Sequence, residues 1–176
     1  MSTTIQEQLV KYLADAHALE QHVNAVLASA LKMTDVPELL GPLEHHKEET
    51  ERHLALLEER LRAHDASPSK VKDAGMALGA LGLGIFERIR SDSAGKLARD
   101  AFVAEHLEIA AYEMLERVAD RAGDKETGDV ARRNKADEQA MAAKIASLWD
   151  LAVDLSLKEE GVEGAPPIPS PKGTAM

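Results

Sequence analysis

Apolar residues recur every three or four positions in four long stretches of the chain, a spacing that predicts amphipathic α-helices. The four stretches are residues 4–31, 35–63, 91–122 and 124–158. No stretch shows the strict alternation of apolar and polar residues that is typical of strands, so the pattern predicts an all-α protein. A short link joins the first stretch to the second, and another joins the third to the fourth. Helices joined in this way are expected to lie antiparallel and side by side. The sequence therefore predicts two helical hairpins that pack together as an antiparallel four-helix bundle.

Residues at the predicted helix ends support these boundaries. Thr4 and Glu7 have the spacing of a capping box for the first helix. Asp35 is placed to cap the second helix, because a proline follows it in the first turn. Gly123 is expected to stop the third helix and Asp124 to cap the fourth, which then runs without a break to about residue 158.

The segment between the hairpins, about residues 70–90, is apolar and contains four glycines among residues 74–86. A bilayer requires about 20 apolar residues, so this run is too short to span one. We expect a short crossover helix that joins the hairpins, either as a buried connector or as a surface for self-association. Residues 159–176 contain four prolines and are expected to form a disordered tail, which leaves residues 1–158 as one domain.

Composition narrows the classes of function. The chain has 176 residues, no cysteine and a formal net charge of −10. The lack of cysteine excludes disulfides, thiolate zinc sites and iron–sulfur clusters. The negative charge argues against nucleic acid as a partner. The first residues show no secretory leader and no long apolar segment follows, so the expectation is a cytoplasmic protein without a membrane partner.

A glutamate interrupts the apolar stripe of each predicted helix, at Glu20, Glu49, Glu108 and Glu138. A buried carboxylate is costly unless something pairs with it, so four of them in one bundle require positive charge. Glu20 and Glu49 are 29 residues apart, and Glu108 and Glu138 are 30 apart, which indicates two similar hairpins. Two divalent cations would balance four carboxylates, and this is the charge balance of a dinuclear metal site in a helix bundle.

Further candidate ligands lie one turn from these glutamates, because residues three and four apart share a helix face. The further candidates are His46, His53 and Glu105. His17 and Tyr112 share a face with Glu20 and Glu108 respectively, and they are placed to support those ligands by hydrogen bonds. Oxygen ligands with a few imidazoles suit iron or manganese.

An ordinary structural interpretation stays open at each position taken alone. A single inward glutamate can reach water from the edge of a stripe, and a histidine beside it can lie on the surface. The Glu-x-x-His motif of many dinuclear bundles is also absent, because neither Glu49 nor Glu138 is followed three residues later by a histidine. Repetition over four helices nevertheless favours a metal site, with nitrogen ligands from the second helix only.

Four segments together resemble the YciE/YciF family of bacterial ferritin-like stress proteins. The segments are Tyr12–Glu20, His46–Thr50, Glu105–Tyr112 and Asp137–Gln139. The resemblance covers about residues 5–157. It implies a ferritin-like bundle with a short extra helix between the hairpins, a dinuclear iron-type site and a homodimer. The ligand candidates that it implies are Glu20, Glu49, Glu108 and Glu138, with His46 and Glu105 as further matches. Ala142 follows Glu138 by one turn, so an acidic ligand at that place in relatives would be missing here.

The resemblance leads to a first hypothesis of function. A centre of two irons per chain, or of manganese, would react with O2 or peroxide in defence against oxidative stress, as a ferroxidase- or peroxidase-like oxidoreductase. A second hypothesis is a metal-binding protein without turnover, in which the metal ties the helices together. A third is a dimeric interaction protein that works through the glycine-rich crossover.

Overall fold

The computed structural model describes residues 3–67, 94–164 and 166. The described helices are α1 (Ile5–Met33), α2 (Pro37–Ala63), α5 (Ala94–Ala122), α6 (Lys125–Ala146) and α7 (Trp149–Glu159). Every regular element in these residues is a helix, which confirms the predicted all-α class. The predicted crossover helix lies outside the described residues, as does most of the predicted tail.

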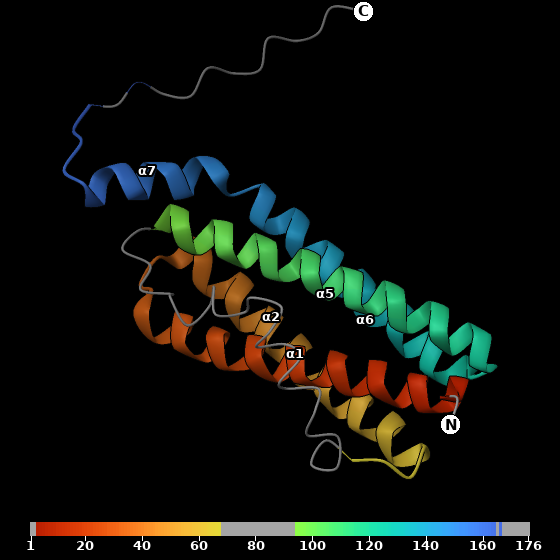
Figure 1. Cartoon of the computed structure of the whole chain (residues 1–176). Helices are drawn as coiled ribbons and strands as arrows, with labels where there is room; N and C mark the ends of the chain where they lie inside the picture. Colours follow the sequence, from red (N-terminus) through yellow and green to blue (C-terminus); the bar gives the residue numbers. More distant parts are fainter. Residues whose placement is uncertain (1–2, 68–93, 165, 167–176) are drawn as a thin grey trace, which may run out of the picture.

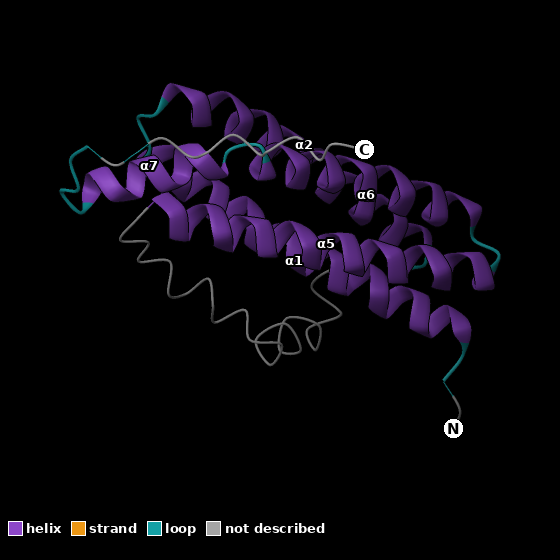
Figure 2. Cartoon of the chain, turned by 90° about the horizontal axis from the view of Figure 1, so that it is seen from above, coloured by secondary structure: helices purple, strands orange, loops and turns teal. Residues whose placement is uncertain are grey.

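The helices form two hairpins that lie against each other (Figure 1). The first hairpin is α1 with α2, and the second is α5 with α6. Across the interface α1 packs against α5 and α2 packs against α6, which closes a four-helix bundle. The view from above shows the long helices running along a common direction (Figure 2). None of the described helices contains a stretch apolar enough to span a bilayer.

Most of the predicted helix ends are confirmed. Thr4 Oγ1 accepts from the Glu7 amide at 3.2 Å while Glu7 accepts from the Thr4 amide at 2.8 Å, so the capping box is present. Gly123 ends α5 with a φ of 73°, a left-handed conformation that favours glycine. The prediction for α2 is wrong, because Val36 and not Asp35 is the residue at the N-cap. Proline follows at the first helical position, where it has no N–H to cap and its fixed φ already suits a helix.

The prediction of one unbroken fourth helix is also wrong. The helix stops at Ala146, and a new helix begins at Trp149 after a two-residue turn. The Leu148 amide donates to the Ile145 carbonyl at 2.9 Å, a tighter bond than the i→i−4 bond of an α-helix. Ser147 Oγ donates to the Lys144 carbonyl at 2.7 Å. The serine hydroxyl thus competes for backbone acceptors at the point where the helix ends.

The helix that follows this turn, α7, packs against the first turns of α5. Two of its side chains accept from backbone amides at the start of α5. Ser156 Oγ accepts from Gly95 at 2.7 Å, and Glu159 accepts from Ala94 at 3.1 Å. A Cβ at residue 95 would lie 2.8 Å from Ser156 Oγ, so a larger residue there would displace this hydroxyl from the position in which it accepts from the residue 95 amide. The last helix therefore caps α5.

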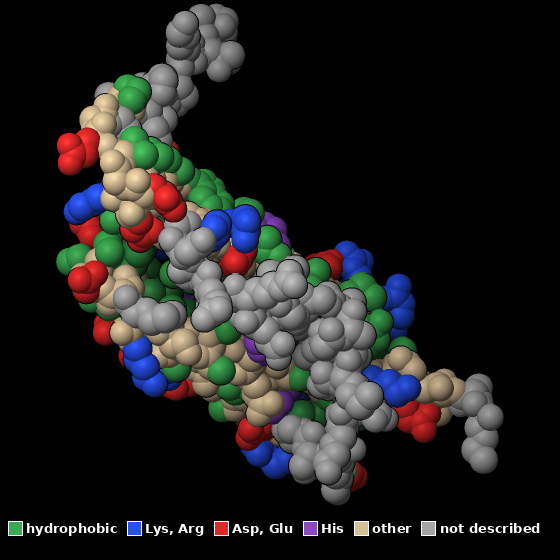
Figure 3. Space-filling model, turned by 60° about the vertical axis from the view of Figure 1, so that its left-hand side comes forward, with side chains coloured by type: hydrophobic (Ala, Val, Ile, Leu, Met, Phe, Trp, Pro, Cys, Tyr) green, Lys and Arg blue, Asp and Glu red, His purple; other side chains and the backbone are tan. Residues whose placement is uncertain are grey.

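The interior changes character along the bundle axis. One end is an apolar core whose fully buried leucines are Leu9, Leu13, Leu57, Leu61 and Leu115. Each such leucine contributes roughly 1.5–3 kcal/mol through burial. The other end holds a small apolar cavity of about 90 Å³, bounded by residues of all five helices. Between these two apolar regions lies a layer of buried polar side chains. The outer surface in Figure 3 carries acidic and basic side chains scattered over the face shown.

Candidate metal centre

Helix α2 directs two imidazoles into the bundle. His46 and His53 are both 1% exposed, and Thr50 between them is fully buried. With Leu43 and Leu57 these residues repeat at alternating spacings of four and three, the spacing that keeps a helix face toward a partner. The inward face of α2 is therefore polar at its centre and apolar at both ends.

The other three helices of the bundle contribute carboxylates at the same level. Glu20 on α1 is 1% exposed, Glu108 on α5 is 1% exposed and Glu138 on α6 is 0% exposed. Glu105, one turn before Glu108 on α5, is 3% exposed. The four carboxylates and the two imidazoles lie between the apolar core and the apolar cavity, where water has little access.

These six side chains form two overlapping groups with Glu138 in common. In the first group, one ligand atom from each of His46, Glu105, Glu108 and Glu138 lies within 4.8 Å of all the others. In the second group, one ligand atom from each of Glu20, His53 and Glu138 likewise lies within 4.8 Å of the others. We call the six residues the buried cluster. Both groups consist only of atoms that can ligate a cation, and a shared glutamate lies between them.

Short nitrogen–oxygen distances connect the two histidines with the carboxylates. His46 Nε2 is 3.3 Å from Glu105 Oε1 and 3.6 Å from Glu138 Oε2. His53 Nδ1 is 2.9 Å from Glu138 Oε1 and 3.1 Å from Glu20 Oε1. The two imidazoles thus lie on opposite sides of Glu138.

Although the imidazoles approach some of them, many polar atoms of the buried cluster have no hydrogen bond of regular geometry. They are both oxygens of Glu108, both oxygens of Glu138, both nitrogens of His46, and one oxygen each of Glu20 and Glu105. A buried polar atom without a partner costs about 1–3 kcal/mol, and an ionised one costs more. Such a concentration of buried atoms without hydrogen-bond partners indicates a binding site for a further group. The lone pairs of oxygen and nitrogen are suited to bind a metal cation.

Burial and mutual repulsion raise the pKa values of the carboxylates. Burial, together with the nearby carboxylates, holds the pKa of Glu108 well above its usual range. Burial also raises the pKa of Glu20, although contacts from His53 oppose it. For Glu105 burial outweighs the contact with His46 and raises the pKa to about 7. Without a metal, the carboxyls therefore hold protons more firmly than ordinary glutamates do.

The pKa values of the two histidines are also raised, but here the cause is the nearby carboxylates and not burial. Burial lowers the pKa of His46, but Glu105 and Glu138 outweigh it and raise the pKa to about 9. Burial likewise opposes protonation of His53, yet Glu138 and Glu20 raise its pKa to about 10. Without a metal, imidazolium protons therefore supply the positive charge that this cluster needs.

A hydrogen-bond network fixes one side of the buried cluster. The Tyr112 hydroxyl donates to Glu20 and accepts from Asn134 Nδ2 at 3.0 Å. On the other side of His53, Nε2 is 3.1 Å from Asp137 Oδ2, and this aspartate side chain is 33% exposed. Such outer partners orient the groups that carry ligand atoms.

The structure brings together six of the seven predicted ligands. Glu49 is the exception: its side chain is 13% exposed and it belongs to neither group. It lies beside the cluster, 3.6 Å from His46 Nδ1. Of the two predicted supporting residues, Tyr112 contacts the cluster, whereas His17 Nε2 faces Glu58 at 3.4 Å.

Sequence analysis missed two supporting residues, Asn134 and Asp137. Asn134 lies four positions before Glu138, so a helical stripe extended backwards from Glu138 reaches it. Asp137 has no such signal, because it lies next to Glu138 and so on a different face of α6. Its contact with His53 depends on how α2 and α6 are placed side by side.

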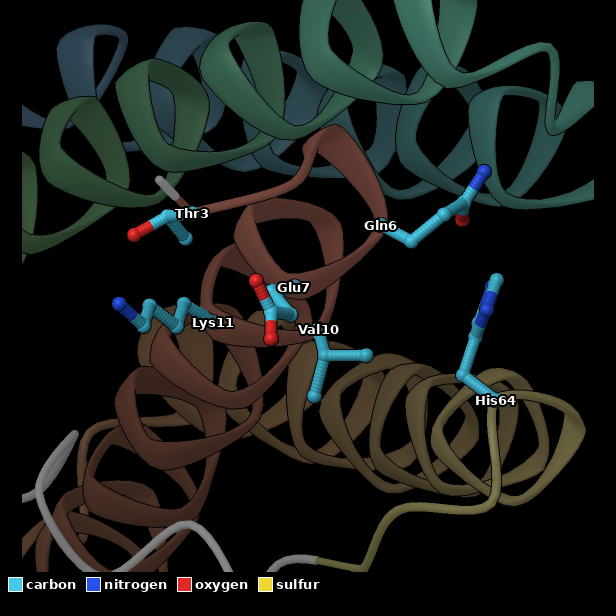
Figure 4. A pocket seen from close by; sticks show the side chains of 6 residues that line it. All are labelled: Thr3, Gln6, Glu7, Val10, Lys11 and His64. Atoms are coloured by element: carbon cyan, nitrogen blue, oxygen red, sulfur yellow. The ribbon is translucent and has the colours of Figure 1, made fainter. Parts of the chain in front are cut away.

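The described residues contain larger hollows elsewhere. One of them, of about 520 Å³, lies at the end of the bundle that carries the N-terminus (Figure 4). Three of its polar side chains already have partners: Glu7 caps α1, His64 Nε2 is 2.7 Å from Asp124, and Gln6 donates to the Ala122 carbonyl at 3.3 Å. That hollow is therefore a weaker candidate for a functional site than the buried cluster.

Comparison with known proteins gives the same fold. A family model described as "Domain of unknown function (DUF892)" matches residues 4–158. A crystal structure of a protein from Xanthomonas campestris pv. campestris is similar with a TM-score of 0.72 and 27% identity, over 90% of this chain and 99% of that one. The crystal structure of the E. coli stress protein YciF is similar with a TM-score of 0.68 and 19% identity, over 87% of this chain and 99% of that one. These likenesses confirm the predicted ferritin-like bundle and the resemblance to YciE/YciF proteins.

Proposed function

This chain belongs to the family of domains of unknown function DUF892, and we propose that its buried cluster binds two metal ions as a dinuclear iron centre, with manganese as the alternative metal. The observation that carries the proposal is the set of buried oxygen and nitrogen atoms without hydrogen-bond partners. The description of the family does not identify a reaction, so the proposal depends on the geometry of the buried cluster.

The residues present fit such a centre in number, kind and charge. His46, Glu105 and Glu108 would hold one ion, Glu20 and His53 would hold the other, and Glu138, which belongs to both groups, would be shared between them. The four carboxylates of the cluster carry four negative charges when ionised, which two divalent cations would balance. A donor set of mostly carboxylate oxygen with imidazole is typical of iron and manganese sites in helix bundles.

We propose that the iron-loaded centre serves defence against oxidative stress through oxidation of Fe(II) by O2 or peroxide. Bound iron would supply one-electron redox chemistry. The chain's own residues hold the ligands in place: Tyr112 orients Glu20, and Asp137 orients His53. The apolar regions above and below the cluster exclude bulk water. The description of YciF as a stress protein supports this role, at the level of a shared fold.

A second candidate function is metal binding without turnover. It is favoured by the way the ligands are drawn from both hairpins, three from α1 and α2 and three from α5 and α6. A metal ion there would connect the two hairpins and stabilise the fold whether or not a reaction takes place.

Metal content and oxygen uptake test the two candidates in turn. The purified protein would be stripped of metal, reconstituted anaerobically with Fe(II), passed through a desalting column and then exposed to air. We expect about two irons per chain and a rise in melting temperature with Fe(II). Consumption of O2 or peroxide in proportion to bound iron would support the redox role, and stable binding without consumption would support the second candidate. Folded protein that retains no metal would overturn both.

A further inference from the structure

Glu49 lies between a buried histidine and an exposed one. His46 Nδ1 is 3.6 Å from Glu49 Oε2, and His46 is 1% exposed. His45 Nε2 is 3.2 Å from Glu49 Oε1, and the His45 side chain is 69% exposed. Arg52 also approaches Glu49 Oε1, at 3.6 Å from the solvent side. The glutamate is thus reached from solvent on one side and from the buried cluster on the other.

Glu49 and His45 also line a surface cleft of about 340 Å³ between α2 and α6. Gly41 lies in the same wall, and the opposite wall includes Ala140 and Met141. These two residues follow Glu138 by two and three positions, so this wall of the cleft lies within one helical turn of the buried cluster.

The ligand atoms form a continuous series from solvent to the interior. It begins at His45 Nε2, passes through the two oxygens of Glu49 and reaches His46 Nδ1. The other nitrogen of the same imidazole ring, Nε2, lies 3.3 Å from Glu105 in the buried cluster. Each step is short, and Glu49 and His45 are related by i, i+4 spacing on one helix face.

We propose that the cleft between α2 and α6 is the route by which metal ions reach the buried cluster, and that His45 and Glu49 form a transient metal-binding site at its mouth. Glu49 then passes the ion inward to His46. This proposal rests on the proposed function, because it assumes that the cluster takes up metal.

The position of Glu49 suits a transient role better than a permanent one. It belongs to neither ligand group, and it is the most exposed of the carboxylates that sequence analysis selected. A residue on the route affects how fast metal binds and leaves, whereas a permanent ligand affects how tightly it binds. The two roles therefore differ in a measurable way.

The first test uses binding kinetics with Co(II), whose visible absorption reports coordination. Metal-free protein would be mixed with Co(II) by stopped flow for the wild type, His45→Ala and Glu49→Gln. We expect both variants to load roughly tenfold more slowly and to reach the wild-type stoichiometry. The matched controls are His106→Ala, an exposed histidine on α5, and Glu51→Gln, which removes the same charge from α2 outside the cleft.

A second variant blocks the cleft without touching a ligand. A Cβ built at Gly41 meets no atom within 4 Å, so a large side chain can occupy the cleft there. Gly41→Trp should slow both the binding and the chelator-driven release of Co(II) by the same factor. The dissociation constant should then be unchanged, because an equilibrium constant does not depend on the route.

The outcomes separate this proposal from the proposed function. Wild-type protein that takes up no Co(II) at equilibrium overturns the metal centre, and the route with it. Wild-type protein that loads normally, with variants that load at the same rate, overturns the route alone. A lower final stoichiometry in Glu49→Gln would make Glu49 a permanent ligand and would also overturn the transient role.

Discussion

Tyr112 on α5 donates its hydroxyl hydrogen bond to Glu20 on α1, a residue 92 positions earlier in the chain. The same hydroxyl accepts from Asn134 Nδ2 on α6 at 3.0 Å. One phenol therefore connects three helices at the level of the buried cluster. The second oxygen of Glu20 and the carbonyl oxygen of Asn134 have no hydrogen-bond partner. Glu20 Oε1 also lies 3.1 Å from His53 Nδ1, so Tyr112 shares that oxygen with the imidazole.

Replacing Tyr112 by phenylalanine should destabilise the protein. The change removes one hydroxyl and leaves Asn134 Nδ2 buried without an acceptor, which costs about 1–3 kcal/mol in the free energy of unfolding. Urea unfolding of the metal-free protein measures the loss. Tyr12→Phe is the matched control, because Tyr12 is half-buried and lies outside this network. Equal losses in the two variants would mean that the phenol contributes nothing specific to the site.

Replacing Glu108 by methionine should separate stability from metal binding. Both Glu108 oxygens are buried without hydrogen-bond partners, so an apolar side chain of similar volume should stabilise the metal-free protein by roughly 1–4 kcal/mol. The same change should lower the amount of metal bound per chain. His106→Ala, which alters an exposed neighbour on α5, should change neither. A stabilised variant that still binds the wild-type amount of metal would exclude Glu108 as a ligand.

Stability of the metal-free protein should fall as the pH rises. Glu105, Glu108 and both cluster histidines have pKa values that are raised in the folded state. The folded chain therefore binds more protons than the unfolded chain, and the slope of stability with pH is negative. For His46 this stability is fully present below about pH 6.5 and is lost as the pH rises through about 9.

Thermal unfolding at a series of pH values, in the presence of a chelator, tests this expectation. The melting temperature should be higher near pH 6 than near pH 9, by an amount that corresponds to about 2–4 kcal/mol. Saturating metal should reverse the slope, because bound ligands are deprotonated and metal binding then competes with protons. A melting temperature that rises with pH in the chelated protein would contradict the protonation states assigned to the cluster.

Asp124 should show the opposite dependence on pH. Burial raises its pKa, but hydrogen bonds from Thr127 and His64, with the charge of Arg60, outweigh it and hold the pKa well below its usual range. Its stability contribution is therefore present above about pH 3.8 and is lost only as the pH falls through the lower folded value.

Two substitutions at Asp124 separate the contribution of its N-cap hydrogen bond to stability from the contribution of its negative charge. Asparagine can still accept from the Thr127 amide at the start of α6, so Asp124→Asn should lose mainly the interactions with Arg60 and His64. Asp124→Ala loses the cap as well and should cost about 1 kcal/mol more. Urea unfolding near neutral pH measures both. Equal losses would show that the side chain does not act as an N-cap.

Helical periodicity is sufficient to predict the bundle. Long amphipathic helices joined by short links have few other ways to bury their apolar faces. Periodicity does not predict the break at Ser147 and Leu148. The stripe continues through these residues to Leu155, and serine is no strong breaker in sequence. The turn depends on hydrogen bonds to nearby carbonyls, which no apolar pattern records.

The site was predictable where its residues lie inside a stripe. Glu20, Glu108 and Glu138 each continue an apolar stripe, and they are buried. Sequence analysis also assigns Glu49 to the centre of the stripe of α2, between the flanking leucines. The true stripe of α2 passes through Thr50, one position further on, and leaves Glu49 at the edge. A strict count of alternating three- and four-residue steps from Leu43 would have found this. Contacts such as that of Asp137 with His53 depend on how the helices are placed together.

The turn at Ser147 and Leu148 separates α6 from α7. This helix contacts α5 through Gly95 and caps its first amides, but it contributes no residue to the buried cluster. It can therefore detach by local unfolding, with a free energy below that of the whole bundle, while all six cluster residues stay in place. Detachment would open the apolar cavity, since Ala152 and Leu155 form part of its wall. We therefore expect the amide hydrogens of α7 to exchange with solvent faster than those of the helices at the level of the buried cluster.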